Sequence, residues 1–429
     1  MDKRTERPTQ RRRAVVLAVG SGGDVAPMAA IAARLAQRGL ATTLLAPQRY
    51  AALAAREGVA FQSIGADDVF AEVFDGPDVW HPRHGLAASW RYYGAALRSG
   101  LAILRQGWDA ADTVLVGSTF AVAGRVAQEQ SGFVGTTVHL SPAVMFSHER
   151  PPRWPDGTNP GRWPRGVRRA VAAAAERWLV DPVIGEQVNP VREGLGLPHQ
   201  RRLFSRWIHS PHRVAWLFPE WFAAAAADWP PNGRFAGFPR LHSHAAELPD
   251  AVRCFLAAGD GPVVVVTAGT AVVARPRWVD TVAAFARRRG ARVIVAAPAA
   301  GDLACAEPGV LHTPFVPFDR LLPQVQLLVH HGGIGTAVDA LRAGVPQWLV
   351  PSAHDQPDNA ARLARLGVAR EFSTSPSEVA LAAAWRDTID HAVMHPALAD
   401  IGRRLAREGD GADRVAEWVA GDALPEQAG

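Results

Sequence analysis

The chain has 429 residues, 48% of them hydrophobic and 20% charged, which describes an ordinary globular protein long enough for two domains. Its formal net charge is only +5, and the 46 basic residues, all arginine except Lys3, are spread among 41 acidic ones. A nucleic-acid-binding protein would gather its basic residues on one face, so this class is disfavoured.

The first half of the chain alternates short apolar runs with helical patterns, which is typical of parallel strands joined by helices. The first apolar run has no polar interruption, as expected of a strand buried on both faces of a sheet. We predict strands over 14–20, 41–46, 59–64, 113–116 and 134–139. Helices are predicted over 28–38, up to residue 58, and near 121–130.

Two long insertions, 66–111 and 141–211, interrupt this alternation and are rich in aromatic residues. Aromatic side chains in such connections often shape a pocket for an apolar ligand, but they also pack as additional core. Both interpretations stay open for Trp80, Trp90, Tyr92, Tyr93, Trp108, Trp154, Trp163, Trp178 and Trp207. Trp80 and Trp90 are our candidates for contact with an acceptor.

The second half restarts the alternation after a stretch rich in proline and glycine, 229–239, which we interpret as a linker. Strands are predicted over 262–268, 292–296, up to 315, 327–330 and 347–350. Helices are predicted up to 289 and over 334–342, 357–366 and 396–418. The chain is therefore divided into an N-terminal domain, 1–242, a C-terminal domain, 243–395, and a helical segment, 396–429.

Several features of the sequence bear on the cellular compartment of the protein. The two cysteines, Cys254 and Cys305, are too few for a disulfide framework and lack metal-ligand spacing. The apolar run 14–19 is too short for a signal peptide, and no uncharged apolar stretch approaches a membrane span. We expect a cytoplasmic protein.

The arginine-rich stretches 11–13 and 162–169 are interpreted as solvated surface. The alternative is that they contact an anionic membrane face or an acidic acceptor.

The first glycine-rich turn, residues 20–25, reads Gly-Ser-Gly-Gly-Asp-Val. It lacks the third glycine of a dinucleotide-binding fingerprint, and the second strand ends without the acidic residue that would hold a ribose, so a dehydrogenase is disfavoured. The turn does place Asp24 at the carboxyl edge of a strand. Asp24 is either a catalytic base or a helix cap, and both stay open.

A second glycine-rich segment, 330–336, runs from an apolar strand directly into a helix and reads His-His-Gly-Gly-Ile-Gly-Thr. The free N–H groups and positive dipole end of such a helix start favour a bound phosphate, to which a histidine and Thr336 could also donate. Asp339 lies one turn further and could reach a ribose. The loop 351–357 offers Asp355 and Gln356 for sugar hydroxyls, although an aspartate there is also ordinary capping.

Together these motifs resemble the inverting glycosyltransferases that include plant UDP-sugar transferases and bacterial natural-product and lipid glycosyltransferases. The resemblance implies that His331 contacts the donor diphosphate, Asp339 the ribose, and the pair Asp355 and Gln356 the sugar. Phe315 takes the place of the aromatic residue that stacks on the base. The implied donor contacts are Gly269, Thr270, Phe315, Val316, His331, Gly332, Gly333, Gly335, Thr336, Asp339, Asp355 and Gln356.

The N-terminal motif of this family carries a histidine base in plant members and an aspartate in many bacterial ones, which implies that Asp24 is the base. The acidic partner of the plant histidine is absent here, where Gly117 and Ser118 stand, as fits an aspartate base. The stretches 116–118, 139–142 and 207–211 are similar to those of the bacterial members that act as rhamnolipid rhamnosyltransferases. We add His139 and Ser141 from these stretches to the acceptor candidates.

The resemblance implies two doubly wound Rossmann-like domains facing a cleft, the GT-B architecture. The N-terminal domain would bind the acceptor and the C-terminal domain the nucleotide sugar, with the last segment crossing back onto the first domain. We expect inverting, metal-independent transfer of a hexose or deoxyhexose, from a UDP- or dTDP-sugar as co-substrate and with no cofactor, to a hydroxyl of a lipid or natural product. The alternatives are a sugar-nucleotide epimerase of the same architecture and a non-catalytic helper protein.

Overall fold

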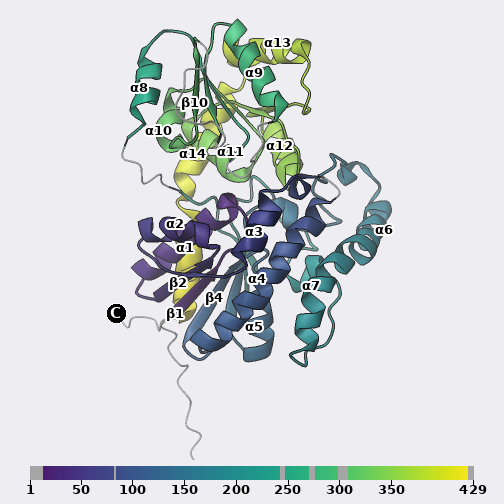
Figure 1. Ribbon diagram of the computed structural model, residues 1–429. Coiled ribbons are helices and arrows are strands. Elements are labelled where there is room, and N and C mark those ends of the chain that lie inside the picture. Colours follow the sequence, from purple (N-terminus) through teal and green to yellow (C-terminus); the bar gives the residue numbers. More distant parts are fainter. Residues whose placement is uncertain (1–12, 82–83, 242–246, 270–275, 298–307, 424–429) are drawn as a thin grey trace, which may run out of the picture.

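The computed structural model describes residues 13–81, 84–241, 247–269, 276–297 and 308–423, which form two α/β units (Figure 1). Each unit is a parallel β-sheet with helices packed on it, and the second unit lies above the first in this view. This is the doubly wound two-domain architecture that the sequence predicts.

The first sheet has seven parallel strands in the order β3-β2-β1-β4-β5-β6-β7. Their bounds are β1 Arg13–Leu17, β2 Ala41–Ala46, β3 Ala60–Ser63, β4 Thr113–Ser118, β5 Val134–His139, β6 Arg213–Trp216 and β7 Gly233–Phe235. Its helices are α1 Gly22–Gln37, α2 Ala51–Arg56, α3 Asp67–Phe74, α4 Gly85–Gly107, α5 Ala123–Ser131, α6 Arg165–Ala175 and α7 Asp181–Glu193. The five predicted strands are confirmed. The sequence pattern misses β6 and β7, and the linker interpretation of 229–239 is wrong at β7, a three-residue edge strand among prolines and glycines.

The second sheet has six parallel strands in the order β10-β9-β8-β11-β12-β13. Their bounds are β8 Val263–Thr267, β9 Arg292–Ala296, β10 Val310–Thr313, β11 Leu327–His330, β12 Gln347–Leu349 and β13 Ala369–Glu371. Its helices are α8 Asp250–Ala257, α9 Arg277–Arg288, α10 Phe318–Leu321, α11 Ile334–Ala343, α12 Gln356–Arg365, α13 Glu378–Trp385 and α14 His395–Glu408. The strand β8 is entirely buried, because helices cover both faces of a sheet built this way.

The order of the strands reverses beside β1 in the first sheet and beside β8 in the second. The connections leave the sheet in opposite directions at such a point, which opens a crevice at the carboxyl ends of the strands. The turn after β1 and the loops after β8 and β11 all lie at these ends. The fold therefore brings the motif-bearing loops to the sheet edges where α/β proteins bind ligands.

The last helix, α15 Gly411–Ala423, returns to the first unit. Its apolar face, which includes Val415 and Val419, belongs to the same buried core as α1 and β1. Ion pairs reinforce the contact, with Arg34 3.4 Å from Asp410. The described part of the chain thus begins and ends on the same unit, as the yellow helix behind α1 shows (Figure 1).

The first insertion supplies core. The long helix α4 buries Trp90 and Tyr92 against α3, α5 and α7, in a cluster on one side of the first sheet. For these two residues the core interpretation is therefore right.

In the described part of the chain, no helix combines the length and the hydropathy needed to cross a membrane.

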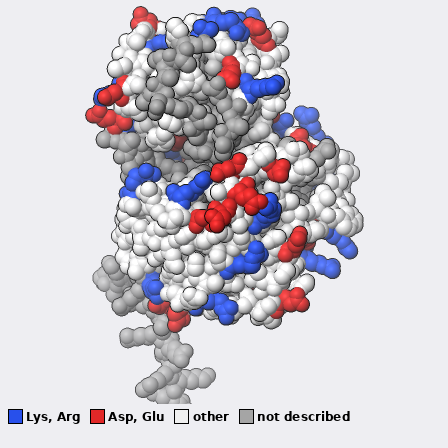
Figure 2. Space-filling view, viewed as in Figure 1, with Lys and Arg blue, Asp and Glu red and all other residues white. Residues whose placement is uncertain are grey.

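Charged side chains of both signs are mixed over the face of the molecule drawn in Figure 2. An acidic patch on that face lies over α3, which carries Asp67, Asp68 and Glu72. Among the described residues on this face, the basic side chains form no continuous surface of the kind that binds a nucleic-acid backbone.

Candidate active site

Asp24 lies in the first turn of α1 on the first unit, whereas His331 and Asp355 lie in two loops of the second unit. The units touch beside them, where the Ser141 hydroxyl donates to Asn359 Oδ1 at 3.2 Å. The rings of Trp80 and His354 also meet across the boundary, with centroids 5.4 Å apart. The predicted catalytic residue therefore faces the predicted sugar-binding loop.

The Asp24 carboxylate is held by its own helix start. Asp24 occupies the third position of α1, and its Oδ2 accepts from Ser21 N at 2.8 Å and from Ser21 Oγ at 3.0 Å. A side chain at Gly20, whose φ is +117°, would overlap this carboxylate, so glycine is required there. The capping role of Asp24 is real, but it occupies only Oδ2.

Burial raises the pKa of Asp24 to about 6, the two hydrogen bonds from Ser21 oppose this shift, and the charge of Asp355 adds to it. A carboxylate with such a pKa is ionised at neutral pH and is a stronger base than an ordinary aspartate. The contribution of Asp355 also places the two carboxylates near each other across the boundary between the units.

All three tyrosines of the chain lie near Asp24. Burial raises the pKa of Tyr50 to about 12, and the negative charge of Asp24 adds to the shift. Burial and the same charge also raise the pKa of Tyr93. These hydroxyls stay protonated at neutral pH, so the only base in this group is Asp24.

Rings in contact lead away from Asp24. Tyr93 stacks on Phe120 at 4.8 Å, Phe120 on Phe204 at 6.2 Å, and Phe204 meets Phe146 edge-on at 5.9 Å. We call these four residues the aromatic strip. Its three phenylalanines are only partly buried. Sequence reasoning missed them, because they come from three segments that only the fold brings together.

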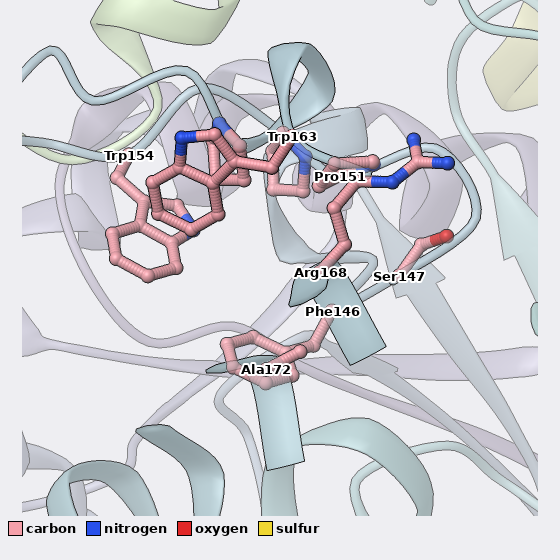
Figure 3. Close-up of a pocket in the computed structure, with 9 residues that line it drawn as sticks. Phe146, Ser147, Pro151, Trp154, Trp163, Arg168 and Ala172 are labelled. Atoms are coloured by element: carbon pink, nitrogen blue, oxygen red, sulfur yellow. The ribbon is translucent and has the colours of Figure 1, made fainter. Parts of the chain in front are cut away.

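The aromatic strip ends at a pocket that Phe146 helps to line (Figure 3). Trp154 and Trp163, edge to face at 5.9 Å, lie on one side of this pocket in the figure, and Ala172 lies on the other. Arg168 is its cationic member. Apart from Ser147, the other lining residues are apolar, which suits an apolar ligand.

The two histidines of the His-Gly segment play different roles. His330 is fully buried, its Nδ1 accepts from Gly332 N at 3.2 Å, and its Nε2 lies 2.9 Å from Gln347 Oε1. Both nitrogens of His330 are thus used inside the protein. The Nδ1 of His331 is buried and has no partner among the described residues. The structure therefore selects His331 as the histidine with a polar atom left for a ligand.

The His331 ring is wedged between two glycines. A Cβ at Gly269, after β8, would lie 2.5 Å from His331 Cε1, and one at Gly333 would overlap its Nε2. Burial lowers the pKa of His331 to about 4, so the ring is neutral at physiological pH and carries one N–H donor. The neighbouring Thr270 lies outside the described residues.

The start of α11 has no side-chain cap. Gly333 is its N-cap residue, and the side chain of Thr336 lies in the first turn. The first N–H groups of the helix are therefore available to an anion. Asp339 follows on the same helix, and burial raises its pKa to about 7, opposed by Arg342.

Asn359 joins three segments of the site, and sequence reasoning gave it no role. Its Nδ2 donates to Gly332 O at 3.1 Å and to Asp355 Oδ2 at 2.8 Å, while its Oδ1 accepts from Ser141. Asp355 is the N-cap residue of α12, but its side chain makes no capping hydrogen bond. The i, i+4 spacing of Asp355 and Asn359 on one helical face is the signal that could have found this contact.

The remaining donor candidates lie at the same edge. Gln356 Oε1 accepts from Ser352 N at 2.9 Å and from Ala353 N at 3.2 Å, which leaves its amide nitrogen for a ligand. Phe315 is 62% exposed, so its ring is accessible for stacking on a base, and Val316 beside it is buried. Gly335, in the first turn of α11, has open space around it.

The acceptor candidates divide into two groups. Trp80 and Ser141 lie at the boundary between the units. Trp90 is buried in the core, and His139 is fully buried with Nδ1 3.0 Å from Thr119 Oγ1 and Nε2 2.9 Å from His209. Because neither Trp90 nor His139 presents a free group, we do not retain them as acceptor contacts.

Among the described residues, no group of three or more His, Cys, Asp or Glu could hold a metal ion.

Two family models match the chain. Residues 14–145 match the glycosyltransferase family 28 N-terminal domain, and residues 280–420 match the C-terminal domain of erythromycin biosynthesis protein CIII-like proteins. The chain is 28% identical over 413 residues to the O-mycaminosyltylonolide 6-deoxyallosyltransferase of Streptomyces fradiae, with 92% of each protein covered. It is 26% identical over 390 residues to an uncharacterized glycosyltransferase of Mycobacterium tuberculosis, with 86% of this chain and 89% of the relative covered.

Solved structures share the fold. The glycosyltransferase of kitacinnamycin superposes with a TM-score of 0.75 at 19% identity, over 97% of this chain and 100% of that one. The spinosyn rhamnosyltransferase SpnG, complexed with thymidine diphosphate, superposes with a TM-score of 0.64 at 19% identity, over 95% of this chain and 100% of that one.

Proposed function

We propose that this chain, which belongs to the glycosyltransferases of the GT-B fold, transfers a deoxyhexose or hexose from a nucleoside diphosphate to a hydroxyl of an apolar natural product, with inversion and without a metal ion. The observation that carries the proposal is the apposition of two groups across one boundary. Asp24, a carboxylate of raised pKa, lies near enough to Asp355 for the two charges to interact. Asn359 joins Asp355 to Gly332, which follows His331, and the Nδ1 of His331 has no partner among the described residues.

In the proposed reaction, the acceptor oxygen attacks the anomeric carbon from the face opposite the diphosphate. The new C–O bond forms as the bond to the diphosphate breaks, the bonding electrons leave with the diphosphate, and the acceptor proton passes to Asp24. The N–H groups at the start of α11 and the N–H of neutral His331 would stabilise the departing charge.

The donor is proposed to be a dTDP-deoxysugar. The Streptomyces fradiae relative is named a 6-deoxyallosyltransferase, and the spinosyn rhamnosyltransferase contains thymidine diphosphate. The residues of the donor site do not distinguish a thymine from a uracil. UDP-hexoses are therefore the comparison donors in the test.

The acceptor is proposed to lie along the aromatic strip, which begins beside Asp24 and ends at the pocket of Figure 3. Partly exposed rings in a row offer apolar area with little polar demand, as a macrolide or polyketide alcohol requires. The first unit is thereby assigned to the acceptor and the second to the donor.

The first test measures thermal stabilisation and calorimetric binding of UDP, dTDP and their sugars. We expect dTDP-deoxysugars to bind more tightly than UDP-hexoses, and transfer to apolar alcohols to continue in the presence of a chelator. If the protein instead interconverts donor sugars with no acceptor present, it is an epimerase. If it binds donors but shows no turnover with any acceptor tried, a helper role gains support.

The second test determines the anomeric configuration of the product from its proton–proton couplings. Direct displacement assisted by Asp24 inverts the configuration of the donor. A product with retained configuration would rule out this mechanism even if transfer itself is confirmed.

A further inference from the structure

Helix α6 and the turn that continues it, residues 176–180, project from the second insertion. We call residues 165–180 the outer helix. No residue of α6 itself is buried, and the helix stands at the right-hand edge of the molecule in Figure 1, away from both sheets. Helices of this length usually owe their stability to an apolar face buried in a core, whereas the side chains of α6 are at most partly buried.

The outer helix exposes large apolar side chains. Val167 is 47% exposed, Trp178 is 68% exposed and Leu179 is 67% exposed. The other exposed large apolar residues among those described, Phe315, Val379 and Val393, are scattered over the second unit. On the outer helix, the spacing of Val167, Ala170, Ala174 and Trp178 places these four residues on one face.

The outer helix and the residues just before it are rich in positive charge. Residues 162–180 contain five arginines and one acidic residue, Glu176, which is buried and accepts from Ser205 N at 2.7 Å and Ser205 Oγ at 2.8 Å. Within the part of the chain that the structure describes, no carboxylate pairs with Arg169 or Arg177. The Arg177 guanidinium lies 5.9 Å from the centroid of the Trp178 ring.

We propose that the outer helix docks this protein on the surface of an anionic lipid membrane. Short amphipathic helices with arginines beside exposed Trp and Leu lie in the headgroup region, where the apolar side chains are buried and the arginines meet lipid phosphates. An acidic protein partner would satisfy the arginines equally well. However, a helix that docks in a protein groove presents apolar anchors at successive turns, whereas here only small alanines lie between Val167 and Trp178 on this face.

The opposite side of the outer helix faces the protein. Arg168 and Ala172 line the pocket in which the aromatic strip ends (Figure 3). Docking would therefore bring that pocket next to the bilayer, where apolar molecules concentrate. The docking itself does not depend on which reaction the protein catalyses.

The test sediments the full-length protein with vesicles of phosphatidylcholine alone or of phosphatidylcholine mixed with phosphatidylglycerol. We expect binding to the mixed vesicles, little to the neutral ones, and release by salt. The double variant Arg169→Ala/Arg177→Ala should bind about fivefold more weakly for each arginine removed. Trp178→Ala/Leu179→Ala should bind more weakly at both low and high salt.

Matched controls are Arg56→Ala, an exposed arginine on α2, and Val379→Ala, an 81% exposed valine on α13, neither of which should change vesicle binding. Thermal unfolding should be unchanged in all variants, because the substituted side chains are exposed. Three results would overturn the proposal: no binding of the wild type to anionic vesicles, binding that the outer-helix variants leave intact, or self-association that they abolish in the absence of lipid.

Discussion

The Asp24 carboxylate caps the start of its own helix and, in the proposed mechanism, also accepts the proton of the acceptor hydroxyl. Its Oδ2 accepts both hydrogen bonds from Ser21, and these bonds fix the side chain without neutralising it. Burial meanwhile disfavours the charge and raises the pKa to about 6. Ser21 therefore holds the side chain in place, while burial makes it more basic.

Asp24→Asn should therefore lose about 10²–10⁴-fold in transfer rate while still binding the donor. It should also be more stable than the wild type at pH 7.5. The pKa of Asp24 is raised from 3.8 to about 6 on folding, so ionisation opposes folding as the pH rises through 6, and asparagine removes that cost of roughly 2 kcal/mol. Denaturant unfolding at pH 7.5 and pH 4 checks this. A destabilised variant at pH 7.5 contradicts it.

The pH dependence of wild-type kcat/KM should report the same group. Activity should rise with pH through about 6, because the base must be ionised to accept a proton. His331 should add no step between pH 5 and 8, since its pKa is lowered to about 4 and the ring is already neutral there. A profile that is flat from pH 5 to 8 would remove Asp24 from the role of base.

Gly333→Ala tests the position of the His331 ring. The backbone at Gly333 suits any residue, with φ of −63°, but the added methyl group would overlap His331 Nε2. We expect nucleotide binding to weaken by about tenfold or more, the value of one hydrogen bond to a charged group. The control is Gly402→Ala on α14, where the new methyl group meets open space. Equal calorimetric affinities for both variants would contradict the proposed diphosphate contact.

At the scale of elements, two helix starts and one buried amide define the donor side. The loop before α11 and the loop before α12 are separate turns, and Asn359 joins them through Gly332 and Asp355. The same side chain reaches the first unit through Ser141. Asn359 is a positioning residue, since no substrate contact is assigned to it.

Asn359→Asp should lower the free energy of unfolding much more than Asn359→Ala does at neutral pH. Aspartate cannot donate to Gly332 O, and it places a second buried negative charge beside Asp355, a cost of about 3 kcal/mol. The difference in unfolding free energy between the two variants should shrink as the pH falls and the carboxyl groups take up protons. If the difference does not depend on pH, Asp355 is not ionised beside Asn359.

At the scale of the whole molecule, the units are connected by α15, which packs on α1, and by the loop that carries Arg153. The Arg153 guanidinium donates to both carboxylate oxygens of Glu371 at 2.7 and 2.6 Å, and its backbone N–H donates to Asp358. Neighbours of Arg153 on this loop, Pro152 and Trp154, line the pocket of Figure 3. The loop thus couples the placement of the units to the shape of the proposed acceptor site.

Arg153→Ala should raise the KM for the acceptor severalfold and leave nucleotide affinity unchanged. The paired groups are about three-quarters buried, so the lost contact should lower the unfolding free energy by about 1 kcal/mol. Arg288→Ala, which removes an exposed ion pair to Glu378 within the second unit, is the matched control and should alter neither KM. A parallel fall in donor affinity in Arg153→Ala would show that the loop does not act on the acceptor alone.

The sequence by itself determined the strands other than β6, β7 and β13, the two-unit architecture and the glycine-rich helix starts. These depend on local properties: uninterrupted apolar runs, glycine where φ is positive, and residues a fixed number of positions apart on one helix. For the same reason Asp24, His331 and Asp355 are recognisable from the sequence. Whether each of them acts on a substrate stays a prediction.

Only the tertiary structure decided how distant segments meet. It separated buried His330 from His331, assigned Trp90 and His139 to the interior, and brought Tyr50 beside Asp24. It also formed the aromatic strip and exposed the outer helix. Burial and contact depend on every segment that packs around a residue, so the same histidine or tryptophan looks alike in the sequence whether the fold encloses it or leaves it at a surface.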